Sequence, residues 1–293
     1  MLEKIAVFCK NLLDWFKSDR CFVRYFIDAF SLANNLLLLT LLILGIFLIS
    51  MYMVIASQYR INTLMSLLVI ILISSVLASG FFHTIKENVN TKLAGEEINR
   101  TNIKNALSVF YTGVGEHYLS FIGMFLLFFV FATIVIFATV FVADTFLCPV
   151  EKLGLSESDL FTLMAYPSQM DSFIQNLDIV QKSGIRAWTR AFMISTQTFT
   201  FLIMLWIPEF IFNKKNVFKA FFSSVKKLFI NFPNSLCVYL TILFLNYLLA
   251  LLMIVFGQFS LIVFILNIVS LYLLIYNFYA IFLYYKGIEE QNV

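Results

Sequence analysis

The sequence has few charged residues and few of the residues that usually carry chemistry. Only 13% of its 293 positions are charged, against about a quarter in an ordinary soluble domain. It contains two histidines and four cysteines, and the cysteines show no CxxC pair and no Cys/His spacing typical of zinc sites. Walker A, GxSxG, HExxH and aspartate-rich diphosphate motifs are also missing. We therefore expect no enzymatic activity, no catalytic residue, no bound metal and no cofactor.

The overall charge is also small, and this excludes some classes of partner. A net charge of +3 is too low to predict nucleic-acid binding or an acidic substrate. A cleavable signal peptide is not visible, because residues 1–33 are amphipathic and charged, with no compact apolar stretch before a cleavage site. We expect the first long apolar run to act as the membrane-insertion signal instead.

Long apolar runs dominate what is present. Hydrophobic residues make up 61% of the chain, and a bilayer core of about 30 Å needs about 20 apolar residues in a helix. A membrane-spanning backbone must satisfy its own hydrogen bonds, which favours helices. The sequence therefore predicts an all-α polytopic transmembrane helical bundle, with about six spans in a single membrane domain over residues 1–293. The predicted spans are 36–56, 62–83, 119–147, 191–212, 235–256 and 259–285, with an external loop over 148–190.

The distribution of lysine and arginine predicts the orientation. Fifteen of the twenty lie before, between or after the spans on the side that also holds both termini. Because positive residues favour the cytoplasmic side of short loops, we expect the N-terminus and the C-terminus to be cytoplasmic. The short loops are typical of a bacterial inner (plasma) membrane protein. The positive residues left outside are Arg60, Lys152, Lys182, Arg186 and Arg190.

Basic amphipathic segments precede several of the spans. In 214–232, phenylalanine and valine recur at the helical period while most lysines fall on the other side, and Pro233 ends the segment. Such a helix lies in the plane of a membrane interface, and each lysine adds about 1 kcal/mol of attraction to anionic lipids. We predict contacts with anionic headgroups for Lys215, Lys219, Lys226 and Lys227. Weaker segments of the same kind occupy 1–17 and 98–111.

The C-terminal part of the chain resembles a known family. Ser223-Ser224 lie in the basic amphipathic segment, Asn231 follows, and two long spans joined by a short turn end at Leu283-Tyr284-Tyr285-Lys286. This pattern, over 214–288, resembles YciC-like bacterial inner-membrane proteins and the membrane domain of some glycerophosphodiester phosphodiesterases. The resemblance implies an inner-membrane location and no catalytic residues, and no phosphodiesterase domain is present.

Two arginines are candidates for anion binding at the outer end of the fourth span. Arg186 and Arg190 stand one helical turn apart with Trp188 between them. Two guanidinium groups at this spacing can share a phosphate or carboxylate. Arginine and tryptophan also anchor span ends at the interface, which is the more common role of such residues.

The fourth span also carries a candidate intramembrane polar site. Glu209 follows Pro208 near its inner end, and Gln197 belongs to a stretch rich in hydroxyl side chains. A carboxylate at membrane depth costs several kcal/mol if it stays unpaired, so it indicates a function or an ion pair. Lys214 and Lys215 are near enough in sequence for such a pair.

The histidines allow one further hypothesis. His83 ends the second predicted span, and Glu116 and His117 precede the third, so a metal or proton site could form if the helix ends meet. Adjacent residues of a helix point about 100° apart, however, which opposes joint binding by Glu116 and His117. We therefore predict no metal site here.

These observations predict a non-enzymatic multi-pass inner-membrane protein. It would act through contact with lipids, mainly anionic headgroups, or as a subunit of a membrane assembly with other membrane proteins. The alternative is a transporter or permease for a small or lipid-like anionic solute, with Pro208, Glu209, Gln197 and Arg190 along its path.

Overall fold

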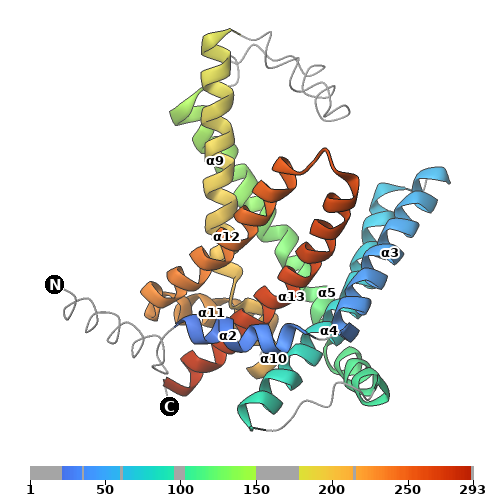
Figure 1. Cartoon of the computed structure of the whole chain (residues 1–293). Helices are drawn as coiled ribbons and strands as arrows, with labels where there is room; N and C mark the ends of the chain where they lie inside the picture. The colour runs from blue at the N-terminus through green and yellow to red at the C-terminus, as the bar shows by residue number, and fades with distance from the viewer. Residues whose placement is uncertain are drawn as a thin grey trace. The chain divides into compact units, whose positions relative to one another are not determined.

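A computed structural model describes residues 22–34, 36–59, 62–95, 103–149, 178–213 and 216–291. All regular structure in these ranges is helical, which confirms the predicted all-α class (Figure 1). The helices are α2 (Phe22–Ala33), α3 (Leu36–Gln58), α4 (Thr63–Leu93), α5 (Ile103–Val142), the π-helix η1 (Ala143–Leu147), α9 (Ile179–Ile203), α10 (Trp206–Asn213), α11 (Val217–Ile230), α12 (Phe232–Val255) and α13 (Ser260–Gln291).

Six of the helical segments are long and apolar enough to cross a membrane, so the chain is a multi-pass integral membrane protein. They correspond in order to the six predicted spans. The segments are Leu38–Gln58, Thr63–Leu93, Asn105–Leu147, Ile179–Asn213, Phe232–Val255 and Ser260–Glu290.

Several helices continue past the ends of the predicted spans. Helix α4 runs on from His83 to Leu93, and Gly95 follows two residues later with a φ of 75°, in the left-handed region that glycine tolerates. Helix α5 begins at Ile103, so the predicted interfacial segment 98–111 and the third span form one continuous helix from that residue onward. Hydropathy marks where apolar residues end, whereas a helix continues through polar residues that have adequate propensity.

Part of the predicted external loop is also helical. Helix α9 begins at Ile179 and carries the last part of the 148–190 segment as a continuation of the fourth span. Residues 150–177 lie outside the described residues, as does the predicted amphipathic segment 1–17.

The fourth span is broken between α9 and α10. Pro208 has no N–H to donate to the carbonyl of Met204, and its ring would clash with that carbonyl in a continuous helix. The chain accordingly turns at Met204 and Leu205. Pro208 then lies in the first turn of α10, where a missing N–H is tolerated.

The chain forms two compact units, which divide it inside α5 and α9. Unit 1 comprises Met1–Phe125 and Ile203–Val293, and unit 2 comprises Leu126–Leu202. In unit 1, α13 is the central element and contacts α2, α3, α4, α10 and α12. Its buried residues concentrate between Ile275 and Ile288, at the end predicted to be cytoplasmic.

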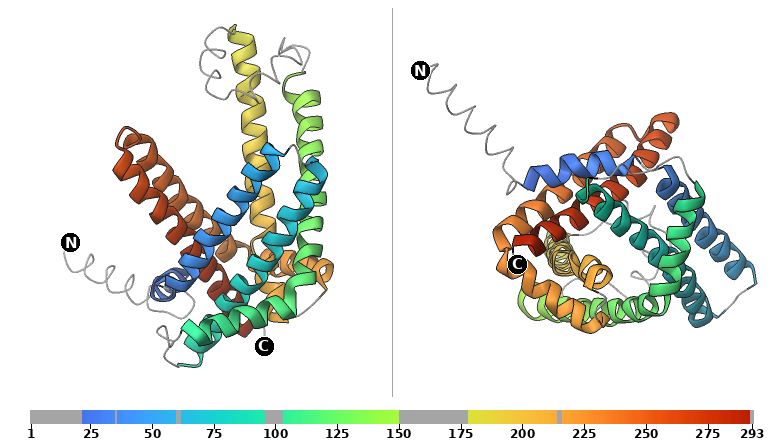
Figure 2. Two further views of the ribbon diagram at one scale, coloured as in Figure 1. Left: turned by 90° about the vertical axis from the view of Figure 1, so that its right-hand side faces the viewer. Right: turned by 90° about the horizontal axis from the view of Figure 1, so that it is seen from below.

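Helix α2 lies along the C-terminal half of α13 (Figures 1 and 2). Ala29 is fully buried, and the ring of Tyr25 packs edge-on against Tyr284 at 5.6 Å between centroids. Gly287 makes this approach possible, because a Cβ at that position would lie 2.1 Å from the hydroxyl of Tyr25. The α3–α4 and α12–α13 hairpins extend from the same buried end and expose apolar side chains, which suits a lipid environment.

Unit 2 contains the remaining part of α5, η1 and most of α9. Thr139 Oγ1 donates a hydrogen bond to Ser195 Oγ at 2.7 Å, and the rings of Phe128 and Phe199 lie 5.6 Å apart. The indole N–H of Trp188 donates to the carbonyl of Cys148 at 2.9 Å. Polar and aromatic contacts therefore both join the two helices of this unit.

Candidate functional site

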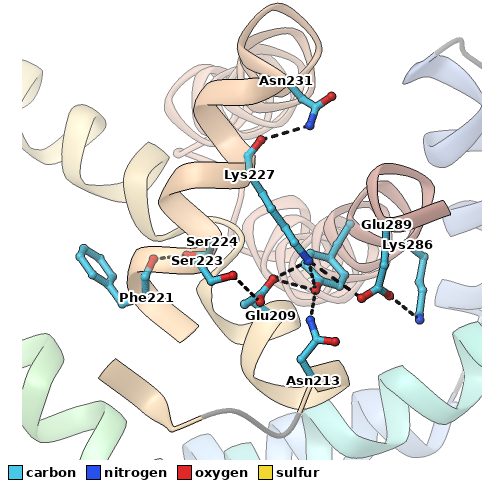
Figure 3. A network of polar contacts seen from close by, with 10 residues as sticks. Glu209, Asn213, Phe221, Ser223, Ser224, Lys227, Asn231, Lys286 and Glu289 are labelled. Atoms are coloured by element: carbon cyan, nitrogen blue, oxygen red, sulfur yellow. Dashed lines mark hydrogen bonds and ion pairs between the residues drawn. The ribbon is translucent and has the colours of Figure 1, made fainter. Parts of the chain in front are cut away.

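The carboxylate of Glu209 is fully buried, with 0% of the side chain exposed, and side chains from α11 and α13 bond to it (Figure 3). Ser223 Oγ donates to Oε1 at 2.7 Å, and the Tyr285 hydroxyl donates to Oε2 at 2.7 Å. Lys227 Nζ forms an ion pair with Oε2, also at 2.7 Å. Such distances are typical of charge-assisted hydrogen bonds.

Three helices supply these groups, and local sequence explains how each is positioned. Glu209 directly follows Pro208 in the first turn of α10, where the positive end of the helix dipole stabilises a negative charge. Ser223 and Lys227 are four residues apart on α11 and so share one face. The side chain of Asn216 caps the first turn of α11 by accepting from the amide of Phe218 at 3.0 Å.

Tyr285 of α13 is the centre of the network. Besides donating to Glu209, its oxygen accepts from Asn213 Nδ2 at 2.5 Å and from Lys227 Nζ at 2.7 Å. Its ring stacks on Phe212, with centroids 5.5 Å apart, and Lys227 Nζ lies 4.5 Å from the ring centroid. The phenol is thus held by both its polar and its aromatic parts.

A second ion pair extends the network along α13. Lys286 Nζ donates to Glu289 at 2.7 Å, and Lys227 Nζ lies 3.9 Å from the other oxygen of Glu289. Ion pairs thus connect Glu209, Lys227, Glu289 and Lys286 in series (Figure 3).

This arrangement has a clear structural consequence. A buried carboxylate loses its hydration, and only close countercharge and hydrogen bonds compensate that loss. Glu209 obtains both from α11 and α13, so the position of the amphipathic helix α11 is fixed by bonds to the end of the fourth span and to the last span. Among the described residues, the network offers no unpaired carboxylate that would serve as a general base.

Some of the residues predicted for the membrane interface and the polar site are buried, and others are exposed. Glu209 and Pro208 are buried, and Glu209 forms an ion pair with Lys227, which was not the lysine expected from the sequence. Lys227 therefore points into unit 1, with its side chain 22% exposed, whereas it was predicted to contact lipid headgroups. Lys219 and Lys226 are exposed, and their contact with headgroups stays a prediction. Lys214 and Lys215 lie outside the described residues.

The other predicted residues belong to unit 2. Arg186, Arg190 and Gln197 are all exposed on α9. Trp188, which separates the two arginines, donates its indole N–H to the carbonyl of Cys148. The structure does not show the proposed anion clamp, and the pair stays a prediction.

Sequence reasoning missed Tyr285, Ser223, Asn213 and Glu289 as members of the network. One signal was present: Ser223 and Lys227 form an i, i+4 pair on the side of α11 that adjoins its apolar face. The helices that hold its partners could not be inferred from this pair. Glu209 lies on a separate helix, α10, and Tyr285 lies 58 residues after Lys227, on α13.

The structure also brings together His83, Glu116 and His117 in unit 1. Their potential ligand atoms all lie within 4.8 Å of one another. The sequence argument that Glu116 and His117 diverge therefore does not hold at the level of side-chain ends, because a glutamate side chain is long enough to bend back toward its neighbour.

The residues that carry the family resemblance have local structural roles. The hydroxyl of Ser224 donates to the carbonyl of Phe221 at 2.8 Å, and Asn231 Nδ2 donates to the carbonyl of Lys227 at 3.2 Å. The chain matches no protein-family model, no curated protein and no solved structure. The resemblance to YciC-like proteins stays a prediction, and function must be argued from geometry.

Proposed function

We propose that this protein is a non-enzymatic inner-membrane protein that acts through lipid contact, holding the acyl chain of a lipid in an apolar pocket of unit 1. The pocket has a volume of about 210 Å³ and lies between α3, α4, α5 and α13. Among the described residues that line it, Ser74 alone has a polar side chain. The pocket is lined by Leu41, Leu42, Gly45, Ile46, Ile49, Ser74, Leu77, Ala78, Phe81, Phe82, Phe110 and Phe278.

The extent of the pocket supports an acyl chain over a polar solute. Its lining on α4 runs from Ser74 to Phe82, about 12 Å along the helix at 1.5 Å per residue. This is less than half of a bilayer core of about 30 Å. The pocket is therefore suited to an apolar chain within one leaflet. Because the α4 lining from Ser74 to Phe82 belongs to the inner half of the predicted span 62–83, we assign the pocket to the cytoplasmic leaflet.

The surface of α11 supports contact with the headgroups of the same leaflet. Phe218, Phe222 and Phe229 are 48%, 56% and 55% exposed, and Lys219 and Lys226 are exposed beside them. Exposed rings next to lysines are typical of helices that lie at an anionic interface. With the network at Glu209 holding α11 in place, this surface is a fixed part of the protein.

Transport of an anionic solute is the alternative, and it has less support. A path for an anion needs accessible positive charge, whereas Lys227 is paired with Glu209 at 2.7 Å, and the Tyr285 hydroxyl bonds to both side chains. A role as a subunit of a membrane assembly would use the exposed apolar surfaces of the spans, which also suit lipid.

A photocrosslinking experiment tests the pocket. The purified protein is placed in nanodiscs of phosphatidylethanolamine and phosphatidylglycerol that contain a lipid with a photoactivatable acyl chain, and adducts are mapped by mass spectrometry. We expect adducts concentrated on the pocket residues of α3 and α4, and a severalfold loss of them in Ala78→Phe, which fills the pocket.

The control substitution is Val54→Phe, at a position 53% exposed on α3 and outside the pocket. It adds the same ring and should leave the adducts in the pocket unchanged. Adducts spread evenly over all exposed apolar positions, and unaffected by Ala78→Phe, would contradict the proposal.

A further inference from the structure

The chain has two histidines, and both lie in the same cluster. His83 on α4 is 5% exposed and His117 on α5 is 3% exposed. Their ring centroids are 5.5 Å apart. Histidine is mostly found partly exposed, so the pairing of the chain's entire histidine content in a buried place needs a physical explanation.

Two glycines bring the histidines together. A Cβ on Gly113 would lie 2.4 Å from Cβ of His83, and a Cβ on Gly80 would lie 2.4 Å from the ring of Phe110. With any other residue at Gly113, α4 and α5 would have to move apart. The close approach at Gly113 places His117, one turn further along α5, beside His83.

Glu116 completes a set of three potential ligands. Its Oε2 lies 3.6 Å from Nε2 of His117, and its side chain is 39% exposed. The ligand atoms of all three residues lie within 4.8 Å of one another. Two buried imidazoles on different helices thus face one carboxylate that is accessible from outside, which gives an ion a way in.

We propose that His83, Glu116 and His117 bind one divalent transition-metal ion that links α4 to α5. Two imidazole nitrogens and one carboxylate oxygen form a donor set that suits Zn²⁺, Fe²⁺ or Mn²⁺. Bonds of about 2.1 Å in tetrahedral geometry place ligand atoms roughly 3.4 Å apart. The cluster therefore needs to contract by little, and the partly exposed side chain of Glu116 is the one with freedom to move.

The surroundings favour such an ion. The ring of Phe210 packs edge-on against His117 with centroids 5.6 Å apart, and Phe121 packs against Phe210 at 5.8 Å. An apolar shell limits the access of water and strengthens the binding of a charged ion to its ligands. Three protein ligands leave at least one coordination position open, as in metal sites that also bind water or a phosphate oxygen.

Elemental analysis tests the proposal directly. The full chain is purified with an affinity tag that contains no histidine and without chelators, and its metal content is measured by plasma mass spectrometry. We expect about one transition-metal ion per chain. After removal of the ion, titration with Co²⁺ should produce the visible absorption of a cobalt ion with nitrogen ligands.

Variants locate the ion. His83→Gln and Glu116→Gln should each lower the affinity for Co²⁺ at least about tenfold, since each removes a ligand. The control is Glu87→Gln, one helical turn after His83, at a carboxylate that lies near Lys86; its affinity should match the wild type. If a histidine variant fails to fold, Glu116→Gln still tests the site, because its partly exposed side chain is not needed for packing.

Either of two results would overturn the proposal. One is a wild-type protein with no transition metal and no Co²⁺ absorption, which would make the cluster an ion pair between Glu116 and a histidine. The other is Co²⁺ binding that Glu116→Gln and His83→Gln leave unchanged.

Discussion

Replacement of Lys227 by methionine is the sharpest test of the network around Glu209. Methionine keeps most of the length and apolar stem of lysine but removes the ammonium group that lies 2.7 Å from the carboxylate. Glu209 is 0% exposed, so its charge would remain buried without this ammonium group, while the hydroxyls of Ser223 and Tyr285 still donate to it. Removing one member of a buried ion pair costs about 3–5 kcal/mol, and we expect Lys227→Met to destabilise the protein by that amount.

The reverse substitution should cost less, for a reason visible in the structure. Glu209→Gln leaves the lysine without its charged partner, but the Lys227 side chain is 22% exposed and retains Glu289 at 3.9 Å. The ammonium group can therefore be hydrated, whereas the carboxylate of Glu209 cannot. In the double variant, the combined loss should be smaller than the sum of the two single losses, because the buried charge and its partner are removed together.

The assay is reversible unfolding in mixed micelles with increasing denaturing detergent, followed by circular dichroism. Lys226→Met is the matched control, since Lys226 is exposed on the same helix, and it should change the unfolding free energy by no more than about 0.5 kcal/mol. Equal effects of the Lys226 and Lys227 substitutions would refute the reasoning.

Three further outcomes follow from the structure. Tyr285→Phe removes one donor to the carboxylate and one acceptor from the network, and should cost about 1–3 kcal/mol in the same unfolding assay. Joint replacement of Lys219 and Lys226 by glutamine should lower the preference of the reconstituted protein for phosphatidylglycerol over phosphatidylcholine among its bound lipids by about tenfold or more, given about 1 kcal/mol per lysine; an unchanged preference after substitution would count against headgroup contact. An impermeant maleimide on intact cells should label the free thiol of Cys148 and leave Cys21 unlabelled until permeabilisation; the opposite pattern would reverse the proposed orientation.

The positions of the spans were predictable because hydropathy and length decide them. Residues 36–56 and 235–256 correspond closely to α3 and α12. The predicted helix ends were less accurate where a helix continues beyond its apolar residues, as α4 does after His83. The break in the fourth span was also not located, because Pro208 interrupts the helix one turn before its own position, at Met204.

The partners of the buried charge were harder to predict. Sequence reasoning singled out Glu209 from its position and expected an ion pair with Lys214 or Lys215, which lie outside the described residues. It did not predict Lys227, which becomes a partner because α11 begins at Val217, soon after α10 ends, and packs against it. Tyr285 joins from the last span. Contacts of this kind depend on tertiary packing, which the periodicity of one helix does not encode.

The proximity of His83, Glu116 and His117 was not predicted, for a different reason. The Cβ atoms of Glu116 and His117 do point in different directions from the helix axis, as the sequence predicts. The ends of long side chains have more freedom, and the close approach at Gly113 brings His83 within reach of both. A glycine four residues before His117 was a signal that two helices could cross there.

Native mass spectrometry of the protein, extracted with its surrounding membrane into polymer-bounded lipid particles, tests the central claim most directly. The account predicts lipid molecules that stay bound to the protein after the particle is stripped away, with fewer of them on Ala78→Phe than on Val54→Phe. A protein that retains no lipid, and that instead leaves the particle with another membrane protein at fixed stoichiometry, would contradict it and make the chain a subunit of an assembly.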